Sequence, residues 1–402
     1  MHGITLIALV VTIVVLLILA GITISLVFSE NGIIAKAREA ANKTNQAVIN
    51  EQAQMNDITA AMENMLNGTG GSTTPEEPED PTENWDLTKV DPVQSTDTTP
   101  VTVPVPKGYT ESKVTGETTV EDGFVIYEGE EEVNDTNKDT AQTTRNQFVW
   151  VPVAKPSDMY GTDADGKKWG KLYNFDEEGI TARNWTEEDG VMSITSATSY
   201  REPDVVDDDS SNSVNLTQLE TEFNSMIASV EKYGGFYIGR YETGNLSQAE
   251  AVVVKNNSDI GSQTWYTMYN KSKGIAANSN VTTTMIWGCQ WDAVMRWMYN
   301  SGDEEKKTYT YDSTEKGNYS GTQGSINKEI PTGSNDAYAV NNIYDMAGNV
   351  RDWTIEADRT YSRVNRGDNY NFSGSSYLAS SRGYDYPTDS YSTHGSRLAL
   401  YM

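Results

Sequence analysis

The sequence has very little cysteine and positive charge. One cysteine, Cys289, stands in 402 residues, which excludes an internal disulfide framework and a zinc site built from cysteines. Lysine and arginine number 30 against 58 acidic residues, giving a net charge of −28. This charge argues against nucleic acid or an anionic lipid surface as a partner of the soluble part. The length leaves room for two or three domains with a sizeable core.

Charged residues are also missing from residues 4–29, near the N-terminus. As a helix this run would be ~39 Å long, more than the ~30 Å hydrocarbon layer of a bilayer. Its apolar part is longer than the ~7–15 residues of an ordinary secretory signal. We therefore predict that residues 4–29 insert into a membrane.

The residues before this run, Met1-His2-Gly3, complete a pattern that resembles a type IV prepilin N-terminus. The resemblance implies cleavage between Gly3 and Ile4, with other pilin subunits as partners. Ala8 stands where pilins carry the glutamate that pairs with a neighbour's free amine. A simple signal anchor that is never processed is the open alternative.

A helical pattern continues behind the apolar run. Apolar residues recur every seven positions, at Ile34, Ala41, Val48, Met55 and Met62. This predicts a long helix over residues 1–67, whose second half is either the amphipathic part of a pilin helix or a plain stalk. Residues 68–106 then hold seven prolines and an acidic cluster, which predicts a disordered or polyproline-like linker.

Residues 107–402 have the patterns of a folded domain. Short runs predict strands at Phe124–Tyr127 and Phe236–Tyr241, and a third strand at Phe148–Val153 is implied by a family resemblance given below. The polar stretch 134–144 is predicted to be a loop.

Two helices are predicted in the same domain. One has apolar residues at helical spacing between Leu219 and Val230 and is closed by Gly234-Gly235. The second covers Trp291–Tyr299. Cys289, just before it, is expected to be a small buried residue and not a nucleophile.

The stretch Asn341–Trp353, NNIYDMAGNVRDW, combines a turn-prone Gly348-Asn349 pair with carboxylates and large apolar anchors. It resembles the N-x-x-D-M-x-G-N-V-W-E-W signature of the formylglycine-generating-enzyme (sulfatase-modifying-factor) superfamily. Further elements resembling that family occur in the family order, at Phe148–Val153, Gly235–Gly244, Trp291–Met298, Arg363–Gly367 and Gly395–Arg397. From about residue 147 onward, the resemblance implies a C-type-lectin-like α+β domain with few regular strands and long loops.

The resemblance also identifies what the chain lacks. Family members that make formylglycine use a cysteine pair with copper, and the matching positions here hold Gly374 and Ala379. Related members bind iron through a histidine cluster, whereas this chain has only His2 and His394. A Ser-His-Asp triad would have to use His394, which has no nucleophile motif nearby and which we expect at the surface. We therefore expect no copper, no iron and no catalysis.

Calcium is the metal that the resemblance does imply. In the family loop the ion is held by residues that match Asn349 and Asp352, together with nearby carbonyls. Ca²⁺ takes about six to eight oxygen ligands of this kind. The open alternative is that both side chains only cap and brace the turn.

The C-terminal tail is rich in residues that suit binding. Of the 42 residues 361–402, 23 are Tyr, Ser, Gly or Asn, and none is Lys. This composition is typical of antibody paratopes, since tyrosine gives rigid amphipathic contact and small polar residues give adaptable hydrogen bonds. The spacing also resembles the variable region of C-type-lectin-fold proteins that are diversified by retroelements.

This second resemblance divides the tail into a fixed frame and a displayed set. The predicted frame is Arg366, Gly367, Ser373, Gly374, Ala379, Arg382, Pro387, Gly395 and Arg397. The predicted ligand-binding set is Asp368, Asn369, Tyr370, Asn371, Tyr377, Tyr384, Asp385, Tyr386, Asp389 and Tyr391. Ordinary Tyr/Ser-rich loops of the same fold, without a retroelement, are the alternative.

Together these patterns predict a ligand-binding protein at a bacterial cell surface. The N-terminal helix would anchor it in the membrane or in a pilus, and the linker would project the domain outward. The tail would contact an extracellular protein or glycan. Two alternatives stay open: a structural minor pilin whose domain caps a filament, and an enzyme of altered chemistry on the same fold.

Overall fold

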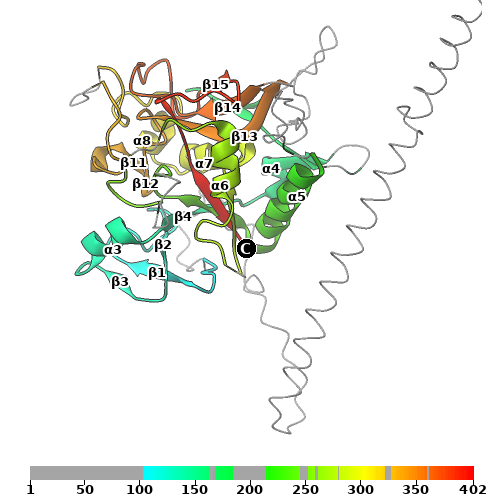
Figure 1. The fold of residues 1–402 in the computed structure, drawn as a ribbon. Coiled ribbons are helices and arrows are strands. Elements are labelled where there is room, and N and C mark those ends of the chain that lie inside the picture. The colour runs from blue at the N-terminus through cyan, green and yellow to red at the C-terminus, as the bar shows by residue number, and fades with distance from the viewer. Residues whose placement is uncertain are drawn as a thin grey trace, which may run out of the picture. The chain divides into compact units, whose positions relative to one another are not determined.

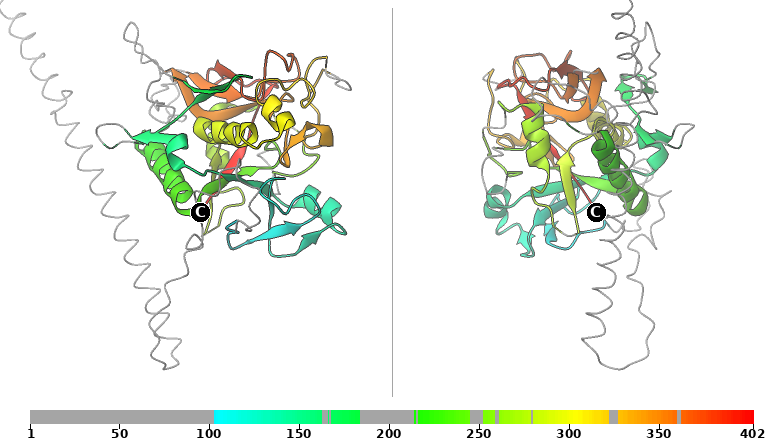
Figure 2. Two further views of the ribbon diagram at one scale, coloured as in Figure 1. Left: turned by 180° about the vertical axis from the view of Figure 1, so that it is seen from behind. Right: turned by 45° about the vertical axis from the view of Figure 1, so that its right-hand side comes forward.

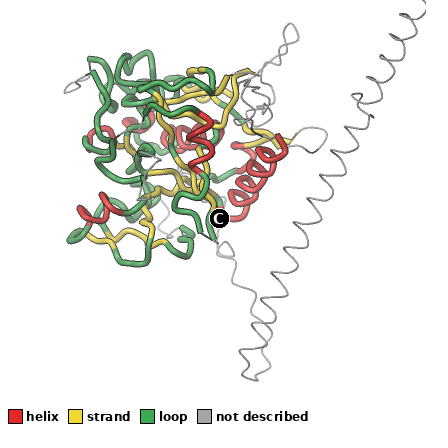
Figure 3. Tube along the Cα trace, in the orientation of Figure 1, coloured by secondary structure: helices red, strands yellow, loops and turns green. Residues whose placement is uncertain are grey.

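The computed structural model describes residues 103–162, 166, 168–183, 214, 216–244, 252–258, 261–278, 280–321, 327–359 and 362–402. The predicted N-terminal helix, its processing residues Gly3 and Ile4, and linker residues 68–102 lie outside this set. Within it, no helix has the length and apolar character needed to cross a membrane. The described residues form several sheets, a few helices and long loops, which confirms the predicted α+β class (Figures 1 and 3).

A seven-stranded sheet forms the centre of the domain. Its spatial order is β10 (Thr282–Met285), β17 (Leu398–Tyr401), β9 (Gly235–Gly239), β4 (Gln147–Pro152), β2 (Val125–Glu128), β1 (Tyr109–Lys113) and β3 (Val133–Asn134). Neighbouring strands are antiparallel except β1 and β3, which are parallel. The three predicted strands are confirmed as β2, β4 and β9. The last two are buried along their whole length, as continuous apolar runs predict.

Both predicted helices pack against this sheet. α5 (Leu216–Tyr233) ends at Gly234, whose φ of 72° stops the helix before β9 begins. α7 (Gly288–Tyr299) begins earlier than predicted, so Cys289 lies in its first turn, and this side chain is buried as expected. Shorter helices are α3 (Lys138–Thr144), α4 (Pro156–Met159), α6 (Trp265–Ser272), α8 (Glu304–Tyr309) and the 3-10 helix η2 (Asp336–Tyr338).

A four-stranded sheet lies at one end of the domain, opposite the corner formed by β1 and β3 (Figures 1 and 2). Its order is β15 (Arg382–Asp385), β14 (Ser362–Arg366), β13 (Arg351–Arg359) and β16 (His394–Ser396). β14 is antiparallel to both β13 and β15, and β16 runs parallel to β13. The tail supplies β14, β15 and β16, so both of its long loops begin and end in paired strands.

Helix α3 corrects the prediction of a loop at residues 134–144. Ala141 and Gln142 are buried in this helix, and Gln142 Nε2 donates to Glu117 Oε1 at 3.2 Å. A helix of seven residues is too short to be stable alone or to show an apolar period, so its tertiary contacts hold it.

The last residues of the predicted linker contact the domain. Val103 is buried in its core. The Tyr237 hydroxyl donates to the Pro104 carbonyl at 2.9 Å and ties this segment to β9.

Three two-stranded ribbons occupy the connections between the larger elements. They are β5 (Tyr160–Thr162) with β6 (Lys168–Gly170), β7 (Tyr173–Phe175) with β8 (Ile180–Ala182), and β11 (Ala339–Val340) with β12 (Ile343–Tyr344). The C-type-lectin-like assignment within the α+β class stays a prediction.

Candidate binding surface

Four charged side chains fasten the sheet of the tail to helix α7. Arg366 Nη2 lies 2.5 Å from Asp292 Oδ1, and its Nη1 lies 3.5 Å from Glu356 Oε2. Arg382 Nη2 lies 2.5 Å from Asp292 Oδ2, and its Nε lies 2.9 Å from Glu356 Oε1. Two buried cations thus balance two buried anions. We call these four residues the charge square, and it joins α7, β13, β14 and β15.

The two arginines of the charge square keep Asp292 ionised. Burial alone would raise the pKa of Asp292, but the guanidinium groups of Arg366 and Arg382 outweigh it and hold this pKa below its usual value. Burial and the neighbouring Arg382 lower the pKa of Arg366 to about 10. Asp292 and Arg366 are therefore both charged near neutral pH.

The first tail loop, residues 367–381, turns sharply as it leaves β14. Gly367 and Asp368 both have positive φ, of 79° and 56°. Arg351 Nη2 lies 3.0 Å from Asp368 Oδ1, and the Tyr319 hydroxyl donates to the Gly367 carbonyl at 3.0 Å. These contacts fix the direction in which the loop leaves the sheet.

Buried groups hold the rest of this loop. Trp291 Nε1 donates to the Ala379 carbonyl at 2.9 Å, and the Ala379 amide donates to Ser313 Oγ at 2.9 Å. At Gly374 a Cβ atom would stand 2.7 Å from Thr314 Cα. As the loop is built, Gly374 has no room for a larger side chain such as that of cysteine.

The second tail loop, residues 386–393, is fixed to the segment that leads into α6. The Trp265 amide donates to the Pro387 carbonyl at 3.1 Å, and the Ser262 amide donates to the Tyr391 carbonyl at 2.9 Å. Ser390 Oγ donates to the Ser262 carbonyl at 2.8 Å. The backbone is therefore held in place while the ring of Tyr391 stays exposed.

His394 is buried beneath this loop. Its Nε2 lies 2.9 Å from Asp385 Oδ2, and its ring centroid lies 5.0 Å from that of Trp353 and 4.9 Å from that of Tyr391. Burial alone would raise the pKa of Asp385, but the hydrogen bond and charge of His394 lower it. The expectation of a surface histidine was wrong, because packing against Trp353 covers the ring.

Four predicted tyrosines are the exposed large apolar side chains of the described residues. The exposed fractions are 39% for Tyr377, 55% for Tyr384, 56% for Tyr386 and 41% for Tyr391. We call these four residues the tyrosine surface. They come from strand β15 and the loops on either side of it, at the end of the domain formed by the four-stranded sheet (Figures 1 and 2). The other predicted residues are Asn371, which is exposed, and the partly buried Tyr370, Asp385 and Asp389.

Asp368 and Asn369 are buried, so the prediction that they are displayed was wrong. Asp368 faces Arg351, and Asn369 Oδ1 accepts a hydrogen bond from the Asn371 amide at 3.0 Å. Short polar side chains often close a turn in this way. Composition alone does not separate such residues from displayed ones.

The predicted frame is mostly buried. Within it, Ser373 is exposed and Arg382 is partly buried, and the buried members are Arg366, Gly367, Gly374, Ala379, Pro387, Gly395 and Arg397.

The tyrosine surface has no exposed cation in the described part of the tail. The tail has no lysine, and Arg363, Arg366 and Arg397 are fully buried. Arg382 is 11% exposed in the charge square. The exposed neighbours are neutral: Asn371, Ser373, Ser375, Ser376, Thr388, Ser390 and Ser392. With the partly exposed carboxylates of Asp385 and Asp389, the tail's contribution to this surface is neutral to acidic, and Arg351 of β13, which is paired with Asp368, is a cation beside it.

The predicted calcium ligands are engaged by protein groups. Asn349 Oδ1 accepts hydrogen bonds from Asn318 Nδ2 and the Ile330 amide, each at 3.0 Å. Asp352 Oδ2 lies 3.1 Å from Arg397 Nε. Among the described residues, no group of three or more His, Cys, Asp or Glu side chains is placed to hold a metal ion. Asn349 and one oxygen of Asp352 thus brace the loop, whereas Asp352 Oδ1 is buried without a hydrogen-bond partner among the described residues, and calcium binding stays a prediction.

A buried cluster of acids that no sequence pattern indicates lies beside this loop. Burial, together with the charges of Asp345 and Asp352, raises the pKa of Glu242 well above its usual value. Burial raises the pKa of Asp345, and it raises the pKa of Asp352 to about 6 although Arg397 opposes the shift. Glu242 lies within the Gly235–Gly244 run, but nothing in the sequence indicated that it meets the other two acids.

No known family model matches the chain, and no curated protein matches it. Solved structures give weak likenesses. PvdO from Pseudomonas aeruginosa has 16% identity and a TM-score of 0.31, over 42% of this chain and 82% of PvdO. Treponema denticola variable protein 1 has 19% identity and a TM-score of 0.22, over 41% and 63% of the two chains. CarF has 13% identity and a TM-score of 0.25, over 64% and 87%. At such TM-scores these likenesses assign neither a fold family nor a function.

Proposed function

We propose that this domain is a binding module that grips an extracellular protein or glycan through its tyrosine surface and does no chemistry on it. The observation that carries the proposal is the exposure of Tyr377, Tyr384, Tyr386 and Tyr391 beside an otherwise well-packed frame. Tyrosine is enriched among the residues that dominate binding energy, because its ring buries apolar area while its hydroxyl keeps a polar partner.

The rigidity of the frame supports this proposal. The charge square holds β15, and buried groups hold the loops on both sides of it. A surface that is already ordered loses less conformational entropy when it binds. A rigid frame therefore suits recognition by side chains that differ from one variant to the next.

The charge of the tyrosine surface indicates which kinds of partner it can bind. Among the described tail residues, Asp385 and Asp389 are the accessible charged groups of the tyrosine surface, and Arg351 of β13, 17% exposed, lies beside Asp385. Like charges across an interface are unfavourable, whereas a lysine or arginine can stack on an exposed tyrosine ring. We therefore propose a partner whose contact surface is neutral or basic, and not a sulfated or sialylated glycan.

The chemical groups of the domain favour binding over catalysis. Burial raises the pKa of the Cys289 thiol well above its usual value, so this residue is not a thiolate near neutral pH. Gly374 and Ala379 supply no thiol where formylglycine-making enzymes have theirs. His394 and Asp385 are paired with each other beneath the second tail loop.

Display at the surface of a bacterium completes the proposal. Residues 4–29 would anchor the chain in the membrane, with processing at Gly3–Ile4, and the linker would hold the domain outside the cell. Diversification of the tail by a retroelement would explain tyrosine, serine and asparagine placed on a fixed frame. A nearby near-copy of the tail's DNA that differs only at adenines would establish it.

The test is a protein and glycan array probed with the full-length chain and with a Tyr384→Ser/Tyr386→Ser double variant. We expect the wild-type chain to bind a partner and the double variant to bind it with at least tenfold lower affinity. If the partner is basic, the affinity should also fall at high salt. Tyr233→Ser is the matched control, because this half-buried tyrosine lies on α5 and outside the tyrosine surface. Equal binding by the double variant and the wild type would refute the proposal.

A further inference from the structure

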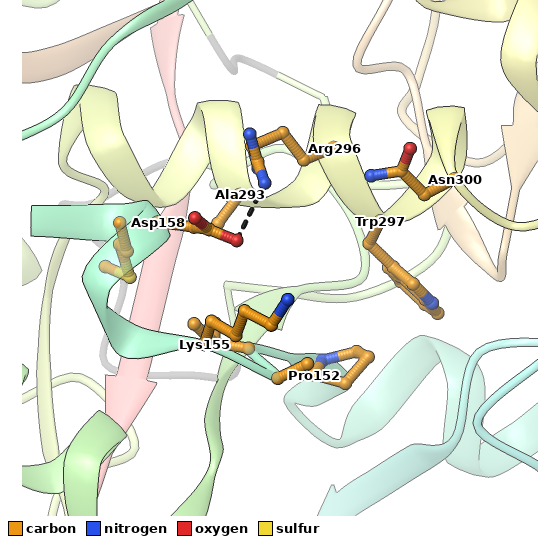
Figure 4. Close-up of a pocket in the computed structure, with 10 residues that line it drawn as sticks. Pro152, Lys155, Asp158, Ala293, Arg296, Trp297 and Asn300 are labelled. Atoms are coloured by element: carbon orange, nitrogen blue, oxygen red, sulfur yellow. Dashed lines mark hydrogen bonds and ion pairs between the residues drawn. The ribbon is translucent and has the colours of Figure 1, made fainter. Parts of the chain in front are cut away.

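A small cavity lies between the turn that follows β4 and the C-terminal half of α7 (Figure 4). Its volume is about 230 Å³, and it shares no residue with the tyrosine surface. Pockets for drug-sized ligands measure ~300–1,000 Å³. This cavity is therefore the right size for a molecule with about one ring.

One part of the cavity wall is apolar. Pro152, Val153, Met159, Ala293 and Trp297 contribute to it, and all five are mostly buried. Burying the apolar surface of a ligand against these residues would lower the free energy of binding by ~25 cal/mol per Å². The wall is formed by the segment from β4 to α4 on one side and by helix α7 on the other. These elements already pack against each other, so the wall is formed before a ligand arrives.

The remaining lining is polar and carries a net positive charge. Arg296 Nη2 lies 2.9 Å from Asp158 Oδ2, and the Lys155 ammonium and Asn300 amide point toward the same space (Figure 4). Lys155 is an exposed residue of the cavity lining. Two cations and one anion therefore line this cavity in a chain whose net charge is −28.

We infer that this cavity binds a small monocarboxylate that carries one apolar ring. Its carboxylate accepts charge-assisted hydrogen bonds from Lys155 and Arg296, and Asn300 donates a further bond. Its ring lies against Ala293 and Trp297. A single negative charge neutralises the cavity, whereas a second would meet Asp158. This inference is independent of the tyrosine surface.

Binding of benzoate and of its neutral isostere benzamide to the full-length chain tests the inference, by saturation-transfer NMR and titration. We expect a millimolar or tighter Kd for benzoate and at least tenfold weaker binding of benzamide. Lys155→Glu, an exposed substitution, should weaken benzoate binding at least tenfold. Asp158→Asn should strengthen it several-fold, because it frees Arg296 from its carboxylate.

Lys232→Glu on α5 is the control, since it makes the same charge change at an exposed lysine outside the cavity. A thermal melt of each variant checks that it is folded. The inference is overturned if benzoate does not bind, if benzamide binds as well as benzoate, or if Lys155→Glu and Lys232→Glu have the same effect.

Discussion

Small residues decide how the loop that carries Tyr377 is packed. Gly374 is buried against Thr314 and Tyr319, and a Cβ atom there would stand 2.7 Å from both of them. The loop passes close to that backbone only because Gly374 has no side chain. The position of Tyr377, three residues later, depends on this contact.

We predict that Gly374→Ala destabilises the domain by about 1–3 kcal/mol, because the added methyl group has no room. It should also weaken binding of any partner of the tyrosine surface. Unfolding in urea measures the first effect. Gly179→Ala is the matched control: its added methyl group would meet no heavy atom within 4 Å, and it should change stability by less than about 0.5 kcal/mol. Equal effects of the two substitutions would contradict this account.

At the scale of elements, the charge square is what holds β15 in place. β15 pairs with β14 alone among the described strands, yet it presents Tyr384 at 55% exposure. Arg382, at the start of β15, reaches Asp292 on α7 and Glu356 on β13. The edge strand is thus fixed to elements beyond its one neighbour in the sheet.

We predict that Asp292→Asn costs about 3–5 kcal/mol, because it leaves two buried arginines facing one remaining carboxylate. Chemical denaturation measures this loss. Lys138→Met is the control, since it breaks the exposed pair between Lys138 and Asp135, and it should cost less than about 1 kcal/mol. If Asp292→Asn lowers the free energy of unfolding no more than the control does, the charge square does not hold β15 in place.

For the whole molecule, the buried acids make stability depend on pH. The folded domain keeps the proton on Glu242 well above the usual pKa of a glutamate, whereas the unfolded chain releases it near pH ~4.3. The folded state then binds more protons than the unfolded state. The contribution of Glu242 is therefore lost as the pH rises from about 4 toward its raised pKa.

We predict that Glu242→Gln gains stability relative to the wild type as the pH rises, by up to about 1.4 kcal/mol per pH unit above pH ~4.3. The difference between the two unfolding free energies removes the contributions of titrating groups that do not interact with Glu242, so it reports Glu242 together with its neighbours Asp345 and Asp352. Glu130→Gln, at an exposed position, should show a nearly constant difference from about pH 4 to 7. A constant difference for Glu242→Gln as well would show that Glu242 is not held protonated.

The sequence by itself determined the helices with an apolar period, several short apolar strands and the exposure of four tyrosines in the tail. α5 and α7 were predictable because hydrophobic periodicity is a local property of the chain, and β9 and β4 were recognisable from a short apolar run and from a motif resemblance, respectively. The exposure of Tyr377, Tyr384, Tyr386 and Tyr391 followed from a paratope-like composition. Helix α3 was missed because a short helix that is held by tertiary contacts leaves no such period.

Only the tertiary structure decided which polar residues are buried, and why. Asp368 and His394 belong to the same polar tail as the exposed tyrosines, but Arg351 and Trp353 cover them from another strand. The charge square, the acid cluster and the cavity each join residues that lie far apart in the chain. Burial and charge pairing depend on which residues are neighbours in three dimensions, and the spacing of residues along the sequence does not determine those neighbours.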